Sequence, residues 1–290
     1  MRSAVFPGGR QRNPPGEPGG PAADRGRPSY TPGMATRSFR TEAVVLRSLR
    51  LGEADRILHV ASLEHGRLGA VAKGVRKTKS KFGARLEPLS HVELELHRGR
   101  GDLHTVTGVE LLHSHHRSRE DGYRLDVGLV AAEAMLRLFP EEEDPHPKAF
   151  QALTRFLDLL DDLPRPVDAD GTPIAGARPA LEPLVLSLQL KLLWVAGYLP
   201  HLGSCAECGA AGPLHGFSTR AGGAVCQRHA EGALTLSPDG LAGMDGLLRR
   251  PLAEAHGVGL TARGARDCLA VVTASYEFNG GFRLRTVASA

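Results

Sequence analysis

The sequence contains no long uninterrupted apolar run, and this absence excludes a helical membrane protein of the usual kind. Its most apolar stretch, residues 181–199, is interrupted by Glu182, Gln189 and Lys191, whereas a helix that crosses a bilayer needs about 20 consecutive apolar residues. The N-terminus has no apolar segment of the kind that directs secretion. We therefore expect a cytoplasmic protein without a membrane partner.

Motifs of nucleotide chemistry and of hydrolysis are also missing. The sequence has neither the G-x-x-x-x-G-K-[ST] loop that holds nucleotide phosphates nor the G-x-G-x-x-G fingerprint of dinucleotide binding. It also lacks the G-x-S-x-G turn of serine hydrolases and the H-E-x-x-H helix of zinc proteases. These absences favour a binding protein over an enzyme and predict no nucleotide cofactor.

Charge is distributed unevenly along the 290 residues, although the formal net charge is only +4. Residues 34–119 carry a net charge of +7, whereas residues 120–290 carry −6. A basic N-terminal part before an acidic C-terminal part indicates a polyanionic partner for the basic part. The alternative is ordinary variation of charge between two domains, which a chain of this length is long enough to form.

The first 33 residues contain 7 prolines and 7 glycines. Such a segment buries too little apolar surface to offset its ordering entropy, so residues 1–33 are predicted to be a disordered leader. Because a regular pattern begins near Met34, we expect translation to start there. The alternative is a flexible basic arm that touches DNA.

Five short strands are predicted between residues 39 and 112, over residues 43–51, 57–63, 68–75, 89–97 and 103–112. In the fourth, Val92, Leu94 and Leu96 alternate with polar residues, which is typical of a half-buried strand. The run Glu64-His-Gly-Arg supplies a hairpin turn between the second and third strands. Five strands in about 75 residues suit a small closed barrel, so residues 34–113 are predicted to form an OB-fold, the five-stranded barrel that binds oligonucleotides.

After residue 119 the apolar residues recur at helical spacing. Helices are predicted over residues 123–139, 150–160, 181–198 and 266–278, and a further helix begins at Ser237-Pro238, a favourable cap and first residue. Cys268 lies on the apolar face of the last helix, which favours a core position. We predict an α+β multi-domain protein in which residues 114–290 form an all-helical domain with an inserted zinc knuckle at 201–234.

Three of the four cysteines form a compact pattern with a histidine. Cys205-x-x-Cys208 is followed by Cys226-x-x-His229, a spacing that matches zinc sites, because each tight turn presents two ligands to one tetrahedral ion. Four protein ligands leave no coordination position for a substrate, so we predict a structural Zn²⁺. His215 is an alternative fourth ligand, and a module that has lost its metal is a further alternative.

A basic segment lies just before the fourth predicted strand. Within residues 73–85 there are six basic side chains and no acidic one. A segment of this kind can follow a phosphate backbone, and its one aromatic ring can stack on a base. The alternative is a solvated basic loop without a ligand. The predicted DNA-binding residues are Lys73, Arg76, Lys77, Lys79, Lys81, Phe82 and Arg85, and the candidates to extend that surface are Arg47, Arg50, Arg56, Arg98 and Arg100.

A histidine cluster follows the fifth predicted strand. His113, His115 and His116 lie beside Arg117 and Arg119. The cluster is a candidate for metal binding, but its composition fits a polar linker between the two domains better.

Several segments, in this order, resemble the N-terminal domain of the RecO family of DNA repair proteins. They are Thr41-Glu-Ala-Val-Val-Leu-Arg, Gly52-Glu-Ala-Asp-Arg-Ile-Leu, Glu64-His-Gly-Arg-Leu, Ala72-Lys-Gly-Val-Arg and Lys79-Ser-Lys-Phe-Gly. The run Gly197-Tyr-Leu-Pro before the cysteines is also similar. The Pro/Gly leader is not part of the family pattern, and residues 278–285 only loosely match the basic C-terminal helix expected there.

The resemblance implies a non-catalytic mediator of DNA repair and homologous recombination, located in the bacterial cytoplasm at the nucleoid. Such a protein binds single-stranded and double-stranded DNA and anneals complementary strands without ATP. Its implied protein partners are RecR and the single-strand-binding protein, beside which it helps to load RecA. Two other classes remain open: a zinc-dependent enzyme acting on nucleic acid with Glu207 as its base, and a helical protein-interaction scaffold.

Overall fold

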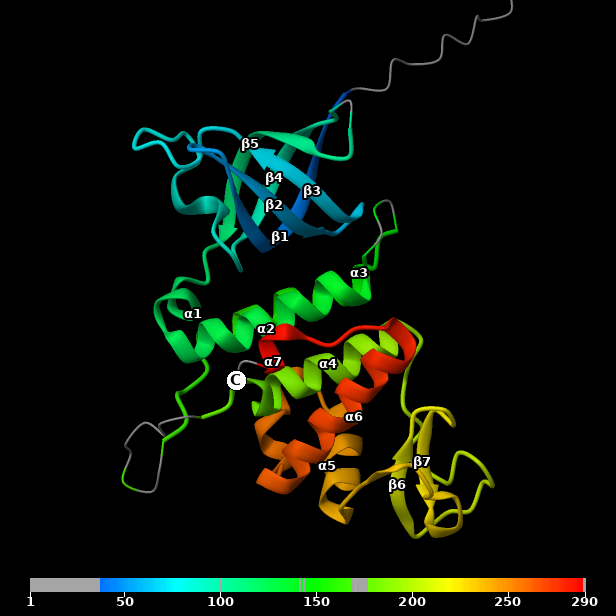
Figure 1. The fold of residues 1–290 in the computed structure, drawn as a ribbon. Coiled ribbons are helices and arrows are strands. Elements are labelled where there is room, and N and C mark those ends of the chain that lie inside the picture. The colour runs from blue at the N-terminus through cyan, green and yellow to red at the C-terminus, as the bar shows by residue number, and fades with distance from the viewer. Residues whose placement is uncertain are drawn as a thin grey trace, which may run out of the picture. The chain divides into compact units, whose positions relative to one another are not determined.

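The computed structural model describes residues 37–99, 101–140, 142, 144–167, 170 and 177–288. The predicted leader, residues 1–33, lies outside the described residues. From Arg37 onward the chain forms one unit, in which strands come first and helices follow (Figure 1). None of the described helices is both long and apolar enough to cross a bilayer.

Five strands close into a barrel: β1 (Ser38–Leu51), β2 (Asp55–Ser62), β3 (Gly66–Ala72), β4 (His91–His97) and β5 (His104–His113). Their order around the barrel is β1-β2-β3-β5-β4. Neighbours are antiparallel except β3 and β5, which pair in parallel. The five predicted strands are confirmed, and their ends differ from the predicted ones by a few residues.

The barrel interior follows from the alternation in the sequence. Val92, Leu94 and Leu96 of β4 are fully buried in the barrel core, because successive side chains of a strand point to opposite faces. The predicted hairpin is present, since Ser62 pairs with Gly66 and Gly66 adopts a φ of 69°, a conformation that favours glycine.

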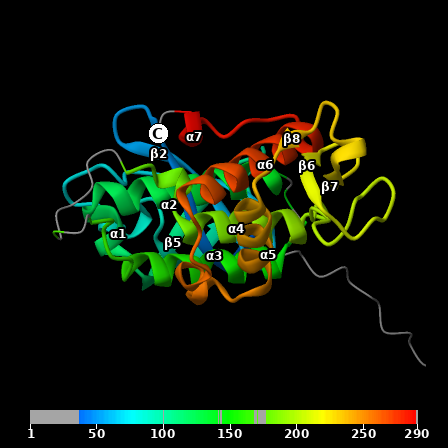
Figure 2. The same ribbon diagram turned by 90° about the horizontal axis from the view of Figure 1, so that it is seen from below.

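The helices are α1 (His116–Glu120), α2 (Gly122–Leu138), α3 (Pro147–Asp161), α4 (Pro183–Val195), α5 (Pro238–Arg249), α6 (Ala262–Gly280) and α7 (Arg285–Ala288). Short 3₁₀ turns at Pro179–Leu181, Leu252–Glu254 and His256–Val258 connect them. Helix α4 is buried on nearly all sides and contacts α2, α3, α5 and α6, as both ribbon views show (Figures 1 and 2). The predicted cap is confirmed, because Ser237 accepts a hydrogen bond from Gly240 N, and Cys268 is fully buried.

The helical half also contains a small sheet that the sequence pattern did not predict. Strands β6 (Leu214–Ser218), β7 (Gly223–Cys226) and β8 (Leu234–Thr235) pair in the order β7-β6-β8. They are too short, at five, four and two residues, for alternation to reveal them. The cysteine module is therefore a β-structure inserted between α4 and α5.

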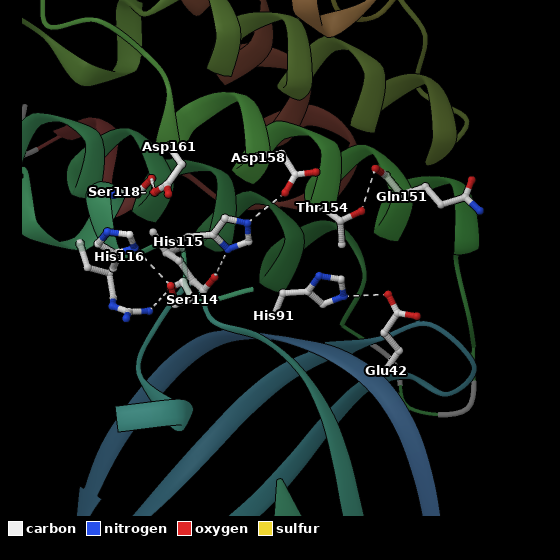
Figure 3. A network of polar contacts seen from close by, with 12 residues as sticks. Glu42, His91, Ser114, His115, His116, Ser118, Gln151, Thr154, Asp158 and Asp161 are labelled. Atoms are coloured by element: carbon white, nitrogen blue, oxygen red, sulfur yellow. Dashed lines mark hydrogen bonds and ion pairs between the residues drawn. The ribbon is translucent and has the colours of Figure 1, made fainter. Parts of the chain in front are cut away.

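The prediction that the histidine cluster is a polar linker between barrel and helices is wrong for His115. This residue is only 4% exposed. Its Nδ1 lies 2.9 Å from the carbonyl oxygen of Leu89, and its Nε2 lies 3.2 Å from Asp158 of α3 (Figure 3). His115 is buried, although its neighbours His113 and His116 are exposed. It lies where α2 packs closely against Leu89: a Cβ on Gly128 would lie only 2.5 Å from Leu89 Cδ1. A buried histidine keeps both ring nitrogens hydrogen-bonded, which explains this arrangement.

A second histidine, His91 of β4, lies at the same junction, with its Nε2 2.7 Å from Glu42 (Figure 3). Burial lowers the pKa of His91, although the hydrogen bond to the Glu42 carboxylate raises it. The unfolded chain therefore binds this proton more readily, so the stability from neutral His91 is complete above about pH 6.5 and is lost as the pH falls.

We expect the substitution His91→Gln to weaken this acid sensitivity. The free energy of unfolding, measured with urea, should fall less for the variant than for the parent between about pH 7 and pH 5. Equal losses in the two proteins would show that His91 does not carry this effect.

Candidate nucleic-acid interface and metal centre

The predicted basic segment forms an exposed loop between β3 and β4. Its start is attached to the turn between β1 and β2, since Gly74 N donates to Asp55 Oδ1 at 2.7 Å and Arg76 N donates to Ala54 O at 2.9 Å. Turn hydrogen bonds from Lys77 N to Gly74 O and from Ser80 N to Lys77 O shape its middle. The backbone is therefore held, while the long side chains extend outward.

Four of the predicted cations are available on this loop. Lys73, Arg76, Lys77 and Lys79 are exposed. The Arg76 guanidinium donates to Glu53 O at 2.9 Å, whereas the side chains of Lys73, Lys77 and Lys79 make no ion pair or hydrogen bond with any described residue. Asp55, an acidic residue next to the loop, already accepts the Gly74 N–H. A cluster of positive charge thus remains at the surface.

Two further predicted cations are tied to β5. Lys81 is exposed, but its Nζ donates to Thr107 O at 2.8 Å. Arg85 is half-buried and donates to three carbonyl oxygens, those of Lys81, Phe82 and Val109. Arg85 therefore fastens the end of the loop, and its guanidinium is less available to a phosphate than those of the exposed residues.

The prediction that Phe82 offers an exposed ring to a base is wrong. Its side chain is 2% exposed and belongs to the barrel core together with Leu86. Phe82 directly precedes a 3₁₀ turn, Gly83–Leu86, and Leu86 is the last residue of this turn. Both side chains point into the barrel. In the sequence, the signal for this burial was a pair of apolar residues four positions apart that follows a run of basic residues. Such a pair can anchor the end of the loop in the core. The Lys81 ammonium lies 4.9 Å from the ring centre.

Replacing Phe82 by alanine should therefore destabilise the protein rather than remove a base contact. Truncation of a buried phenylalanine costs about 3–5 kcal/mol, and Phe82→Leu should cost much less because it keeps most of the volume. Urea unfolding measures both. If Phe82→Ala left stability unchanged and instead weakened DNA binding, the stacking interpretation would be restored.

The candidates to extend the basic surface divide into three groups. Arg47 and Arg50 are exposed. Arg56 lies 3.5 Å from Glu87 and donates to Ser48, and the guanidinium of Arg98 lies over the ring of Phe39. Arg100 lies outside the described residues.

The metal-ligand pattern of the sequence converges in space. Cys205, Cys208, Cys226 and His229 each place one ligand atom within 4.8 Å of the others. Cys226 ends β7, and the 3₁₀ turn Gln227–His229 brings His229 back beside it. His215 lies on β6 and is not a member of this group. Of the two alternatives for the fourth ligand, the geometry therefore favours His229.

The distances within the cluster fit a tetrahedral ion. His229 Nδ1 lies 3.5 Å from Cys205 Sγ and 3.4 Å from Cys226 Sγ, and the sulfurs of Cys208 and Cys226 lie 3.9 Å apart. With Zn–S of about 2.3 Å and Zn–N of about 2.1 Å, a tetrahedron places two sulfurs about 3.8 Å apart and sulfur and nitrogen about 3.6 Å apart. The cluster can therefore bind a metal.

The surroundings of Cys205 favour the thiolate form of its side chain. Hydrogen bonds from backbone groups, that of Cys226 first, lower the pKa of Cys205 to about 5. The thiolate is the form that binds metal. Glu207, the base that a zinc enzyme would need, is exposed between Cys205 and Cys208, and four protein ligands leave it no metal-bound water to activate.

Comparison with known proteins places these features in a family. Residues 34–115 match the family described as "Recombination protein O N terminal", and residues 174–287 match "Recombination protein O C terminal". The chain is 42% identical over 190 residues to "DNA repair protein RecO" of Cutibacterium acnes, which covers 65% of this chain and 73% of that protein. It is 36% identical over 254 residues to "DNA repair protein RecO" of Thermobifida fusca, which covers 86% of this chain and 98% of that protein.

Proposed function

Because the chain belongs to the RecO family of DNA repair proteins, we propose that it binds and anneals single-stranded DNA through the loop of residues 73–85. The observation that carries this proposal is the exposure of Lys73, Arg76, Lys77 and Lys79 on one loop of a small barrel. Cations grouped in this way neutralise the phosphates of a strand without reading its bases.

We assign the barrel, and with it residues 34–113, to the OB-fold class. Support comes from the five strands, their closure and the order β1-β2-β3-β5-β4. OB-folds bind oligonucleotides with strands and loops of the barrel. Residues 114–290 would then be the helical domain, with a zinc module at 201–234.

Annealing follows from electrostatics without an enzymatic step. Two complementary strands repel each other, and a basic surface that neutralises part of their charge lets base pairing proceed without ATP. The same surface would hold double-stranded DNA through its phosphates. The family resemblance supports further roles in the bacterial cytoplasm at the nucleoid: work with RecR and the single-strand-binding protein to load RecA.

We propose that Cys205, Cys208, Cys226 and His229 hold a structural Zn²⁺. The support is the donor set and its tetrahedral spacing. When bound, the ion would cross-link the turn at Cys205-x-x-Cys208 to the end of β7. Because the protein would fill every coordination position, this zinc would stabilise the module and carry no catalysis.

The salt dependence of DNA binding tests the loop proposal. Four phosphate contacts on a single strand predict that log affinity falls against log salt with a slope of about −3. Fluorescence anisotropy with an oligo-dT strand at several salt concentrations gives this slope. An affinity that does not change with salt would refute binding by phosphate neutralisation.

A further inference from the structure

A pocket of about 630 Å³ lies between the outer face of the barrel and the helices α2, α6 and α7. Among the described residues, four arginines and one acidic side chain, Glu133 of α2, line it. The volume suits a small organic group. The arginines come from four elements, β1, β3, α2 and α7, and are Arg47, Arg67, Arg137 and Arg285.

The barrel wall of the pocket is electropositive. Arg47 pairs in register with His59 of β2, and Arg67 of β3 pairs with Ala61 of the same strand. Burial lowers the pKa of His59, and the positive charges of Arg67 and then Arg47 lower it further. The guanidinium groups of Arg47 and Arg67 therefore both lower the pKa of the His59 imidazole.

The carboxylate of Glu133, the acidic side chain that the structure describes in the pocket, is already engaged. Glu133 accepts hydrogen bonds from Arg285 N and Thr286 N, both at 2.9 Å, and from Thr286 Oγ1 at 2.7 Å. The side chains of Arg47, Arg67 and Arg137 form no ion pair or hydrogen bond with the part of the chain that the structure describes. Arg137 instead lies 4.8 Å from the ring centre of Phe282. The positive charge of these three arginines is thus left for a ligand.

We propose that this pocket binds the phosphate group of a nucleotide, with Arg47, Arg67 and Arg137 on the phosphate and the sugar or base against Leu129 and Leu136. Arginine guanidinium groups bind phosphate oxygens through paired hydrogen bonds, and the apolar wall suits a sugar or base. The ligand is a nucleotide, either free or within a nucleic-acid strand.

This site goes beyond the loop of the proposed function and is separate from it. Arg67 lies at the start of β3 and Lys73 follows its end, so the two sites are about 20 Å apart along that strand. The pocket does not depend on the loop cations, and each site can be tested with the other disabled.

His59 serves as a reporter of the pocket. In the full chain, the NMR signals of the His59 imidazole should shift, and its pKa should rise, when an anion binds between Arg47 and Arg67. The probes are inorganic phosphate, thymidine 5′-monophosphate and an oligo-dT strand at equal ionic strength, each with the parent and with the variant Lys73→Glu/Lys77→Glu/Lys79→Glu. A response to oligo-dT at lower concentration than to the two small probes assigns the site to a strand. A response to the monophosphate at the same or a lower concentration assigns it to a free nucleotide.

The double variant Arg47→Gln/Arg67→Gln should abolish the His59 response to every probe that the parent binds. If the parent's response assigns the site to a strand, the double variant should also make the slope of log affinity against log salt for oligo-dT shallower by about 1.4, at about 0.7 for each phosphate contact. The matched control is Arg155→Gln/Arg220→Gln, which removes two exposed arginines that do not line the pocket. An unchanged His59 signal in the parent with all three probes would overturn the proposal, whatever the fate of the variants. A response to inorganic phosphate alone would overturn the nucleotide assignment.

Discussion

Replacing Lys73, Lys77 and Lys79 by glutamate should lower the affinity of the full chain for single-stranded DNA by about 100-fold or more at 0.1 M salt. Each phosphate contact on a single strand contributes about 0.7 log units at this salt concentration through counterion release, so three lost contacts give about two log units. Reversal of the charges adds repulsion. Fluorescence anisotropy with an oligo-dT strand measures the change.

The fold should survive these substitutions because all three side chains are exposed and no described residue pairs with them. The matched control is Lys148→Glu/Arg155→Glu/Arg220→Glu, which makes the same change of charge at exposed positions outside the loop. It should lose only the small part of the affinity that depends on net charge. Equal losses in both triple variants would mean that overall charge, and not the loop, governs binding.

Replacing Cys205 by serine should remove the metal and unfold the module of residues 201–234. The module has a very small core of its own, formed among the described residues by Cys205, Val225 and Cys226, while Phe217 of β6 packs into the larger helical core. A core of this size cannot stabilise a fold, and zinc binding supplies about 10–16 kcal/mol in comparable peptides. Metal analysis should find about one zinc per chain in the parent and none in the variant, and limited proteolysis should cleave the module of the variant.

The helical part should remain folded in this variant, because its larger core does not include the ligands. Cys268→Ala is the matched control: its thiol is fully buried in α6, away from the cluster, so the variant should keep its zinc. Binding of oligo-dT should be nearly unchanged in both, since the loop lies on the barrel. A Cys205→Ser module that resists protease like the parent would refute a structural role for the metal.

Local patterns predicted most of the fold. The alternation in β4, the Ser237 cap and the helical stripe of α6 each act within a few residues, so the sequence displays them directly. The convergence of Cys205, Cys208, Cys226 and His229 was predictable for the same reason, because two x-x spacers place four possible ligands on two tight turns. Choosing His229 over His215 required the β6–β7 pairing.

The errors concern residues whose roles depend on distant partners. Phe82 looked like an exposed ring in a basic loop, but its side chain is buried in the barrel core. His115 looked like part of a polar linker, but it is buried between Leu89 and Asp158, residues remote in sequence. The arginine pocket was not predicted from the sequence for the same reason. Its lining residues range from Leu46 to Thr286, so no short segment of the sequence contains them.

The most direct test of the central claim is the rate at which two complementary oligonucleotides anneal in the absence of ATP. The parent and the control Lys148→Glu/Arg155→Glu/Arg220→Glu should both accelerate annealing at about 0.1 M salt, and Lys73→Glu/Lys77→Glu/Lys79→Glu should return the rate to that of the free strands. If the loop variant accelerates annealing as the parent does, the cations of residues 73–85 are not the surface on which strands meet.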